Sequence, residues 1–306
     1  MTRHDRIYEE KELLALTLLG ERKIREFWRD GYCVLESAVP AHLLSRLSAD
    51  MDAWVEESRN HASNYGETIN GRPRFDLDPS HSADHPALRR VNAPAEISEA
   101  HYEAATDSPM VDAVAELIGP NVKFHHSKTN AKLPQTTTPV RFHQDFPFTP
   151  HSNDDIVTVL LMLDEVSEDN GCLEVVPGSH EGPIHTLWYE GRFTGAIDPV
   201  LEAKMREKAV PVTGAAGSAC LMHTRLLHGS APNLTDRPRT LFICVYSAED
   251  AVPLSPNPMP NRYEGMVVRG QGSGRVRSKD FELNLPELPS GASFFEQQAK
   301  AGPGRG

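Results

Sequence analysis

From residue 122 onward, the sequence is a series of short apolar runs that are separated by glycine, proline and other turn residues. Runs of this length and composition are typical of β-strands. Several of them in succession favour a β-sandwich or barrel over a parallel α/β sheet. The runs span residues 122–132, 140–145, 156–166, 172–178, 209–213, 218–228 and 239–247.

The first 120 residues follow a different pattern, because their apolar residues recur at the three- and four-residue spacings of amphipathic helices. We expect helices at 10–28, 40–58 and 109–118, with a short strand at 32–37 and a long loop at 60–86. The loop is long enough to be a functional segment such as a lid.

The end of the chain is rich in proline and glycine and is expected to be largely irregular. We therefore predict one domain over residues 1–306. It consists of a mostly helical part (1–120), a β core (121–250) and an irregular tail (251–306).

Two potential metal ligands lie two residues apart in the second apolar run. His143 and Asp145 would point to the same face of a strand, because side chains alternate along it. His228 ends a later run and can supply a third ligand. Two imidazoles and one carboxylate suit ferrous iron and leave positions open for a cosubstrate and dioxygen. The alternative is a chance pairing of a histidine with an aspartate, since the chain holds 14 histidines and 43 acidic residues.

The residues that follow His228 favour the metal site. Ser230 comes two residues later, and Arg239 begins a run that is typical of a buried strand. An arginine is costly to bury without an anionic partner, and its planar guanidinium can hold a carboxylate through two parallel hydrogen bonds. We therefore expect Arg239 to bind an anion near the metal. Arg237 precedes a proline in a turn and is expected to face water.

Together these motifs resemble the phytanoyl-CoA dioxygenase family of Fe(II)- and 2-oxoglutarate-dependent oxygenases. The resemblance covers most of residues 24–247 and implies a mainly β fold, a double-stranded β-helix (a jelly-roll, cupin-like barrel) flanked by N-terminal α-helices. The matching segments are WRDGYCVLESAVPAHLL at 28–44, NAKLP at 130–134, HQD at 143–145, DNGCLEVVPGSH at 169–180 and HGSAPNLTDRPR at 228–239.

The resemblance also implies roles for individual residues. His143, Asp145 and His228 would bind Fe(II), and these three are the expected catalytic centre. The 2-oxoglutarate would be bound by four residues, which are Arg239, Ser230, Lys132 and Asn130. Without the resemblance, the alternating polar residues at 126–132 are more typical of the solvated side of an edge strand.

The implied activity is hydroxylation of an unactivated C–H bond of a small molecule. It uses Fe(II), 2-oxoglutarate and O2, with ascorbate as a supporting reductant, and it releases succinate and CO2. The substrate stays open between an acyl-CoA, an amino acid and a natural-product intermediate. Arg89 and Arg90 would suit an anionic substrate, or they belong to a solvated helix or loop end. Residues 261–277 of the tail, together with loop 60–86, would cover the site. The arginines of this segment would also suit an anion; these are Arg262, Arg269, Arg275 and Arg277.

Two other classes of protein share such a β core. One is a barrel metalloenzyme that does not use 2-oxoglutarate, such as a cupin-type dioxygenase or an isomerase. The other is a non-catalytic jelly-roll binding module. Arg239 and Ser230 argue against the first class, and an intact triad of buried polar ligands argues against the second.

The composition of the chain excludes several kinds of partner. A formal net charge of −12 disfavours nucleic acid. No apolar run approaches the ~20 residues that span a bilayer, and the N-terminus lacks the apolar core of a signal peptide. We expect a small-molecule substrate, no nucleic acid, no membrane and a cytoplasmic location; the residues do not indicate an oligomeric state. The cysteines are scattered without CxxC spacing: Cys33, Cys172, Cys220 and Cys244.

Overall fold

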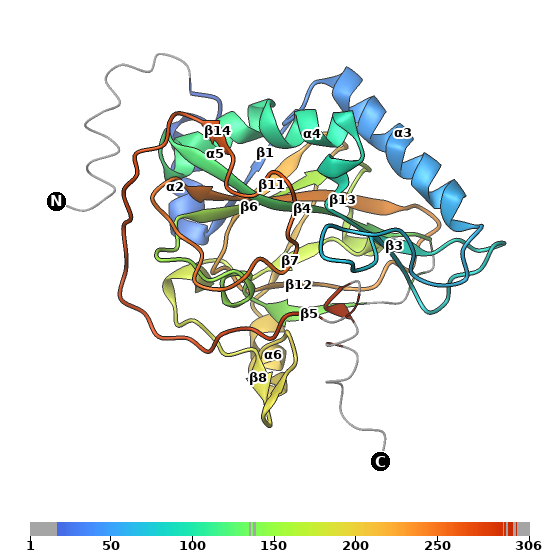
Figure 1. The fold of residues 1–306 in the computed structure, drawn as a ribbon. Coiled ribbons are helices and arrows are strands. Elements are labelled where there is room, and N and C mark those ends of the chain that lie inside the picture. Colours follow the sequence, from blue (N-terminus) through green and yellow to red (C-terminus); the bar gives the residue numbers. More distant parts are fainter. Residues whose placement is uncertain are drawn as a thin grey trace.

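Two antiparallel sheets face each other in the computed structural model, which describes residues 17–134, 136, 139–289, 291, 293–295 and 298 (Figure 1). The larger sheet has the strand order β1 (Tyr32–Leu35), β11 (Ala219–His223), β6 (Ile156–Met162), β13 (Arg239–Ala248), β4 (Val122–Lys132), β3 (Leu88–Asn92) and β2 (Phe75–Leu77), and β14 (Val267–Arg269) also pairs with β4. The smaller sheet has the order β10 (Val210–Val212), β7 (Leu173–Val175), β12 (His228–Ser230) and β5 (Val140–His143). This arrangement confirms the predicted jelly roll.

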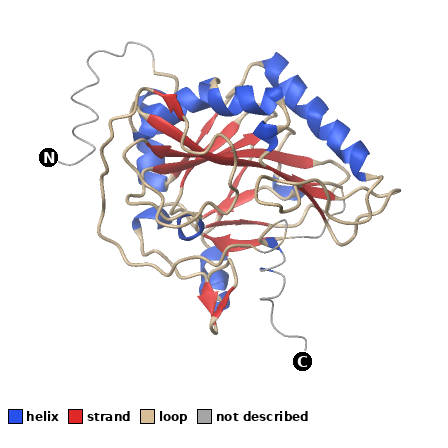
Figure 2. Ribbon diagram, viewed as in Figure 1, coloured by secondary structure: helices blue, strands red, loops and turns tan. Residues whose placement is uncertain are grey.

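Helices cover the outer face of the larger sheet (Figure 2). They are α2 (Gly20–Asp30), α3 (Ala41–Ser58), α4 (Glu99–Thr106) and α5 (Pro109–Ile118). A further helix, α6 (Pro199–Arg206), and the hairpin of β8 (Trp188–Tyr189) and β9 (Arg192–Phe193) lie on the side of the smaller sheet. Among the described residues, no helix has both the length and the apolar character needed to cross a membrane.

The strands of the larger sheet alternate between two cores. In β6, Val157, Val159 and Leu161 pack against the helices. Leu160 and Met162 point the other way, into the space between the two sheets. This period of two follows from strand geometry, and it is what gives the barrel an interior that can hold a site.

Most of the predicted elements are confirmed, with several differences, which include the unpredicted α6, β8 and β9. The predicted helix at 10–28 begins at Gly20, and its residues 10–16 lie outside the described part of the chain. The predicted strand at 218–228 is two strands, β11 and β12, which belong to different sheets. The first 120 residues also contain elements that the sequence pattern did not indicate, namely β2, β3 and α4.

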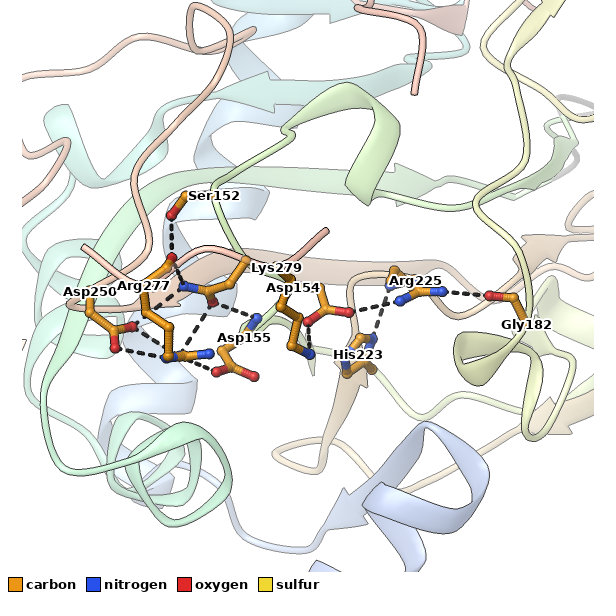
Figure 3. Close-up of polar contacts among 10 residues, drawn as sticks. Ser152, Asp154, Asp155, Gly182, His223, Arg225, Asp250, Arg277 and Lys279 are labelled. Carbon is orange, nitrogen blue, oxygen red and sulfur yellow. Dashed lines mark hydrogen bonds and ion pairs between the residues drawn. The ribbon is translucent and has the colours of Figure 1, made fainter. Parts of the chain in front are cut away.

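The tail has little regular structure apart from β14, yet side chains attach it to the barrel (Figure 3). Arg277 forms ion pairs with Asp155 and with Asp250, the latter at 2.9 Å. Two residues later, the Lys279 ammonium donates to Asp154. Ser152 also binds this segment: its hydroxyl donates to the carbonyl of Arg277, and its own carbonyl accepts from the backbone N–H of Lys279. The described tail is therefore part of the folded barrel wall.

Asp154 is a buried member of this anchor, since its side chain is only 4% exposed. It accepts from Lys279 and, at 2.8 Å, from Arg225, and His223 lies nearby. Burial would raise the pKa of this carboxyl, but the two cations outweigh burial and hold the pKa of Asp154 well below its usual range. The carboxylate is therefore charged in the folded protein at neutral pH.

We expect Asp154→Asn to lower the free energy of unfolding by ~2–4 kcal/mol, because two cations would lose the carboxylate between them. Urea unfolding at neutral pH measures this change. Asp169→Asn is the matched control, since Asp169 pairs with Arg237 at the exposed surface. This control should lower the free energy of unfolding by less than ~1 kcal/mol. Equal and small changes in both variants would mean that the tail is held mainly by other contacts.

Candidate active site

The pairing of β5 with β12 brings together two histidines that are far apart in the sequence. His143 is the last residue of β5 and lies directly opposite His228, the first residue of β12. The centroids of their rings are 4.2 Å apart. In an antiparallel pair, directly opposed side chains lie on the same face. Both imidazoles therefore point to one place inside the barrel.

Asp145 reaches the same place by a different route from the one expected. The prediction that it continues the strand of His143 is wrong, because β5 ends at His143. Asp145 has helical backbone angles and precedes a short 3₁₀ helix, η3 (Phe146–Phe148). The turn after the strand, and not strand alternation, directs its carboxylate back to the two histidines.

The three side chains form a compact group of possible ligands. Their nearest ligating atoms all lie within 4.8 Å of one another, and no other such group exists among the described residues. One oxygen of Asp145, Oδ1, is 3.6 Å from Nε2 of His143 and 3.8 Å from Nε2 of His228. Two imidazoles and one carboxylate on one side of a centre are the donor set of non-haem Fe(II) oxygenases. The residues present therefore fit such an iron.

Neighbouring groups orient each of these ligands. Nδ1 of His143 is 2.8 Å from the carbonyl oxygen of Arg141, and Nδ1 of His228 is 3.0 Å from that of Leu226. A ring nitrogen that donates to a carbonyl leaves the other nitrogen, Nε2, free to bind a metal. Burial and the nearby His143 lower the pKa of His228 to about 4, so its imidazole is neutral at neutral pH.

Thr158 is a positioning residue that the sequence analysis missed. Its hydroxyl donates to Oδ2 of Asp145 at 2.7 Å, and its side chain is buried on the inner face of β6. The bond occupies one carboxylate oxygen and leaves Oδ1 facing the histidines. The signal in the sequence was the polar residue at the alternate position of an otherwise apolar strand, IVTVLLM.

A cavity of about 50 Å³ extends from the triad between the two sheets; we call it the strand-lined cavity. Arg239, Ser230 and Asn130 all line it, as expected of residues that would bind 2-oxoglutarate. Arg239 is buried, and its Nε donates to the carbonyl oxygen of Gly171 at 3.0 Å. Burial lowers the pKa of Arg239 to about 10, which still leaves it charged at neutral pH. The remaining guanidinium nitrogens have no hydrogen bond to the described residues.

Lys132 lies beside this cavity without lining it. It is paired in register with Arg239, and its ammonium donates to the Ser230 hydroxyl at 2.7 Å and to the carbonyl of Ala231. Burial and the adjacent Arg239 lower the pKa of Lys132 to about 6. In this structure Lys132 orients Ser230, and direct contact with 2-oxoglutarate stays a prediction.

The polar row on β4 faces the interior of the barrel. The alternative of an exposed edge strand is wrong, because β4 lies between β13 and β3. Asn130 and Lys128 line the strand-lined cavity, and Lys128 and His126 line a second cavity beyond the triad. Alternate residues of one strand thus connect the two spaces.

The second cavity also encloses about 50 Å³ and shares His143 and Asp145 with the first. We call it the tail-lined cavity, because Pro258, Met259, Pro289, Ser293 and Phe294 form part of its wall. The tail therefore covers the site, but with mostly apolar residues on either side of 261–277, the segment from which we expected the cover. Its cations lie elsewhere: Arg262 pairs with Glu96, Arg269 with Asp112, Arg277 with Asp155 and Asp250, and Arg275 is exposed.

The two arginines of β3 have different partners. Arg89 forms an ion pair with the buried Asp76 at 2.9 Å, so it is engaged within the fold. Arg90 is buried in the wall of the tail-lined cavity, where it contacts Asn130. Neither is the solvated loop end that the sequence left open. Loop 60–86, which contains β2, contributes Arg72 to the same wall.

Comparisons with known proteins agree with this geometry. The family model of phytanoyl-CoA dioxygenase (PhyH) matches residues 27–241. A probable alpha-ketoglutarate-dependent hypophosphite dioxygenase of Stutzerimonas stutzeri is 32% identical over 90% of this chain and 95% of its own length. The peroxisomal phytanoyl-CoA dioxygenase of Homo sapiens is 25% identical over 76% of this chain and 69% of its own.

Solved structures share the fold. EctD from S. alaskensis in its apoform superposes with a TM-score of 0.65 at 22% identity, over 85% of this chain and 90% of that chain. The same enzyme with 2-oxoglutarate and 5-hydroxyectoine gives a TM-score of 0.64 at 21% identity, over 90% and 91% of the two chains.

Proposed function

Because the chain belongs to the phytanoyl-CoA dioxygenase family of Fe(II)- and 2-oxoglutarate-dependent dioxygenases, we propose that His143, Asp145 and His228 hold its iron and that it hydroxylates a small molecule. The observation that carries this proposal is the convergence of these three ligating atoms within 4.8 Å, beside a cavity that ends in a buried arginine. The site thus has a place for the metal and a separate place for a dicarboxylate.

Fe(II) bound with 2-oxoglutarate supplies the activation of O2 in such enzymes. In the overall reaction, one oxygen atom of O2 enters the substrate as a hydroxyl group and the other enters succinate, while CO2 leaves. The two-electron oxidation of 2-oxoglutarate and the two-electron oxidation of the substrate together account for the four electrons that reduce O2.

The protein's own residues bind and orient the reactants. Arg239 receives the far carboxylate of 2-oxoglutarate, with a further hydrogen bond from Ser230 and contact from Asn130. Lys132 donates a hydrogen bond to the Ser230 hydroxyl and so holds Ser230 in place beside the proposed site of this carboxylate. The apolar walls of the strand-lined cavity, which include Leu160, exclude water from the reacting groups.

The two other classes of protein fit the site less well. A barrel metalloenzyme without 2-oxoglutarate has no use for a buried guanidinium in the wall of the cavity. A binding module has no use for two imidazoles and a carboxylate that hydrogen bonds orient toward one point. The first alternative predicts an activity that does not depend on 2-oxoglutarate, and the second predicts no activity.

The test is release of succinate by the Fe(II)-loaded protein with 2-oxoglutarate and O2. We expect iron-dependent succinate release, and stimulation by one of the molecules for which relatives are named. These are hypophosphite, L-proline, ectoine and phytanoyl-CoA. Mass analysis of the stimulating molecule should show one added oxygen atom. Absence of succinate under all of these conditions, with iron bound, would contradict the proposed function.

A further inference from the structure

The guanidinium of Arg90 is held in the wall of the tail-lined cavity with part of its hydrogen-bonding capacity unused. Its Nε donates to the side-chain oxygen of Asn130 at 2.8 Å. Its plane lies against two aromatic rings, with centroids of Phe294 and Phe295 at 4.8 and 4.7 Å. The side chain is 3% exposed, and Nη2 has no hydrogen-bond partner among the described residues. Native proteins rarely leave a buried donor of this kind without a partner unless a ligand supplies it.

A second cation lies on the same face beside Arg90. In the register of β3 with β4, Arg90 is opposite Asn130 and Asn92 is opposite Lys128, so Lys128 is the diagonal neighbour of Arg90. Lys128 lines both cavities next to the triad. Burial, together with the charge of Arg90, lowers the pKa of Lys128 to about 8. Two cations placed so closely in a buried wall repel each other unless an anion lies between them.

Among the described residues that line this cavity, the one acidic side chain is the proposed iron ligand Asp145; the nearby Asp76, behind the wall, is paired with Arg89. The neighbouring cations are already engaged. Arg72 donates to the carbonyl oxygens of Pro289 and Pro258, and Arg89 is paired with Asp76. Arg90 and Lys128 are therefore the cations of this wall that remain available to a ligand.

The cavity also places that ligand next to the proposed iron site. Its volume of about 50 Å³ equals that of the strand-lined cavity, so a compact anion no larger than 2-oxoglutarate fits this space. Phe294 lines the cavity from the tail side and packs against the His143 ring at 5.7 Å.

We propose that Arg90 and Lys128 bind the anionic group of a small oxyanion substrate and hold it against the proposed iron site, with Phe294 as its cover. The inference rests on the proposed function and specifies its substrate class. The oxyanion carries hydrogen on the atom that is oxidised, and that hydrogen is replaced by hydroxyl. Hypophosphite, on which the relative from Stutzerimonas stutzeri is named as acting, has this chemistry and would become phosphite.

The experiment measures binding without turnover. Protein loaded with Fe(II) and 2-oxoglutarate under argon is titrated with hypophosphite in a calorimeter. We expect saturable binding by the wild type, and a dissociation constant raised about tenfold or more in Arg90→Gln and in Lys128→Gln, because each removes one charge-assisted contact. The dissociation constant for 2-oxoglutarate should rise by a clearly smaller factor than that for hypophosphite in both variants, since Arg239 and Ser230, which would bind its far carboxylate, line only the other cavity.

Three controls make the result decisive. Arg275→Gln removes an exposed arginine of the tail and should leave hypophosphite binding unchanged. Arg90→Lys keeps the charge but loses the planar group beside the two rings, and it should recover only part of the affinity. Thermal unfolding of each variant identifies any loss of fold. L-proline, a zwitterion, should bind more weakly than hypophosphite, formate or phosphite.

Two results would overturn the inference. One is that neither hypophosphite nor the other small anions bind the wild type more tightly than L-proline does. The other is that Arg90→Gln and Lys128→Gln weaken 2-oxoglutarate binding as much as hypophosphite binding, which would assign both cations to the cosubstrate. In either case, iron-dependent succinate release would still support the proposed function, so the two failures are distinguishable.

Discussion

Asp145→Ala is expected to abolish hydroxylation while leaving the fold intact. The variant loses the carboxylate from a site with two imidazoles, and both its oxygens have assigned partners: the triad centre on one side and Thr158 on the other. Loss of an outer-shell partner alone costs about 10–100-fold in metal affinity or activity, and loss of a ligand should exceed that. Succinate release at saturating 2-oxoglutarate, together with the iron content of the purified protein, measures the effect.

The expected structural cost of this change is small. Within the described part of the chain, the ion pairs of Asp145 are with His143 and His228 and not with arginine or lysine. The η3 turn that follows it is held by backbone hydrogen bonds from Phe146 and Phe148. The melting temperature should therefore be close to that of the wild type. Asp280→Ala, which removes an exposed carboxylate of the tail, is the control for activity. Full hydroxylation by Asp145→Ala would remove Asp145 from the ligand set.

The apolar pattern was enough to predict most of the β core, because strands such as β6 that are buried on both faces consist mainly of apolar residues. β6 lies within its predicted run, and β13 extends one residue beyond its run. β4 also matches its run, although its inner face is polar. The same pattern did not separate β11 from β12, since Met222, Leu226 and Leu227 are all buried and the turn between these strands contains no glycine or proline. Which sheet a strand joins is decided by tertiary pairing, which a local pattern does not report.

The helical elements that were missed are short, and each depends on its ends. α4 begins at a Ser98 cap that accepts from the backbone of His101, and α6 begins at an Asp198 cap. Eight residues give too few turns for a clear helical period. β2 and β3 were missed for a different reason, because their sequences, FDL and LRRVN, mix charged and apolar residues on an inner face that serves the site.

For the candidate site too, some residues could be predicted from the local sequence and others are found only from the folded chain. His143, Asp145 and His228 could be proposed from their spacing, and Arg239 from the cost of burying its charge. Thr158 and Phe294 could not, because the first is one polar residue in an apolar strand and the second lies 149 residues after Asp145 in an irregular tail. Only the folded chain shows that Lys132 turns toward Ser230 while Lys128 turns toward the triad.

Arg239→Lys is expected to raise the Michaelis constant for 2-oxoglutarate by about 10–100-fold while changing that for the main substrate much less. The guanidinium offers two parallel donors to a carboxylate, and a lysine ammonium offers a single point of contact. The loss of one hydrogen bond to a charged group costs ~1.5–3 kcal/mol, which corresponds to this range. Initial rates of succinate release, with each reactant varied in turn, give the two constants.

Arg237→Lys is the matched control, since Arg237 lies two residues away and is 49% exposed at the protein surface. It should leave both constants unchanged. Arg239 also donates to the carbonyl of Gly171, so its replacement could act by disturbing the fold and not by weakening cosubstrate binding. A structural role would raise both Michaelis constants equally and lower the melting temperature. Only a selective rise for 2-oxoglutarate at an unchanged melting temperature supports Arg239 as the residue that binds the cosubstrate's far carboxylate.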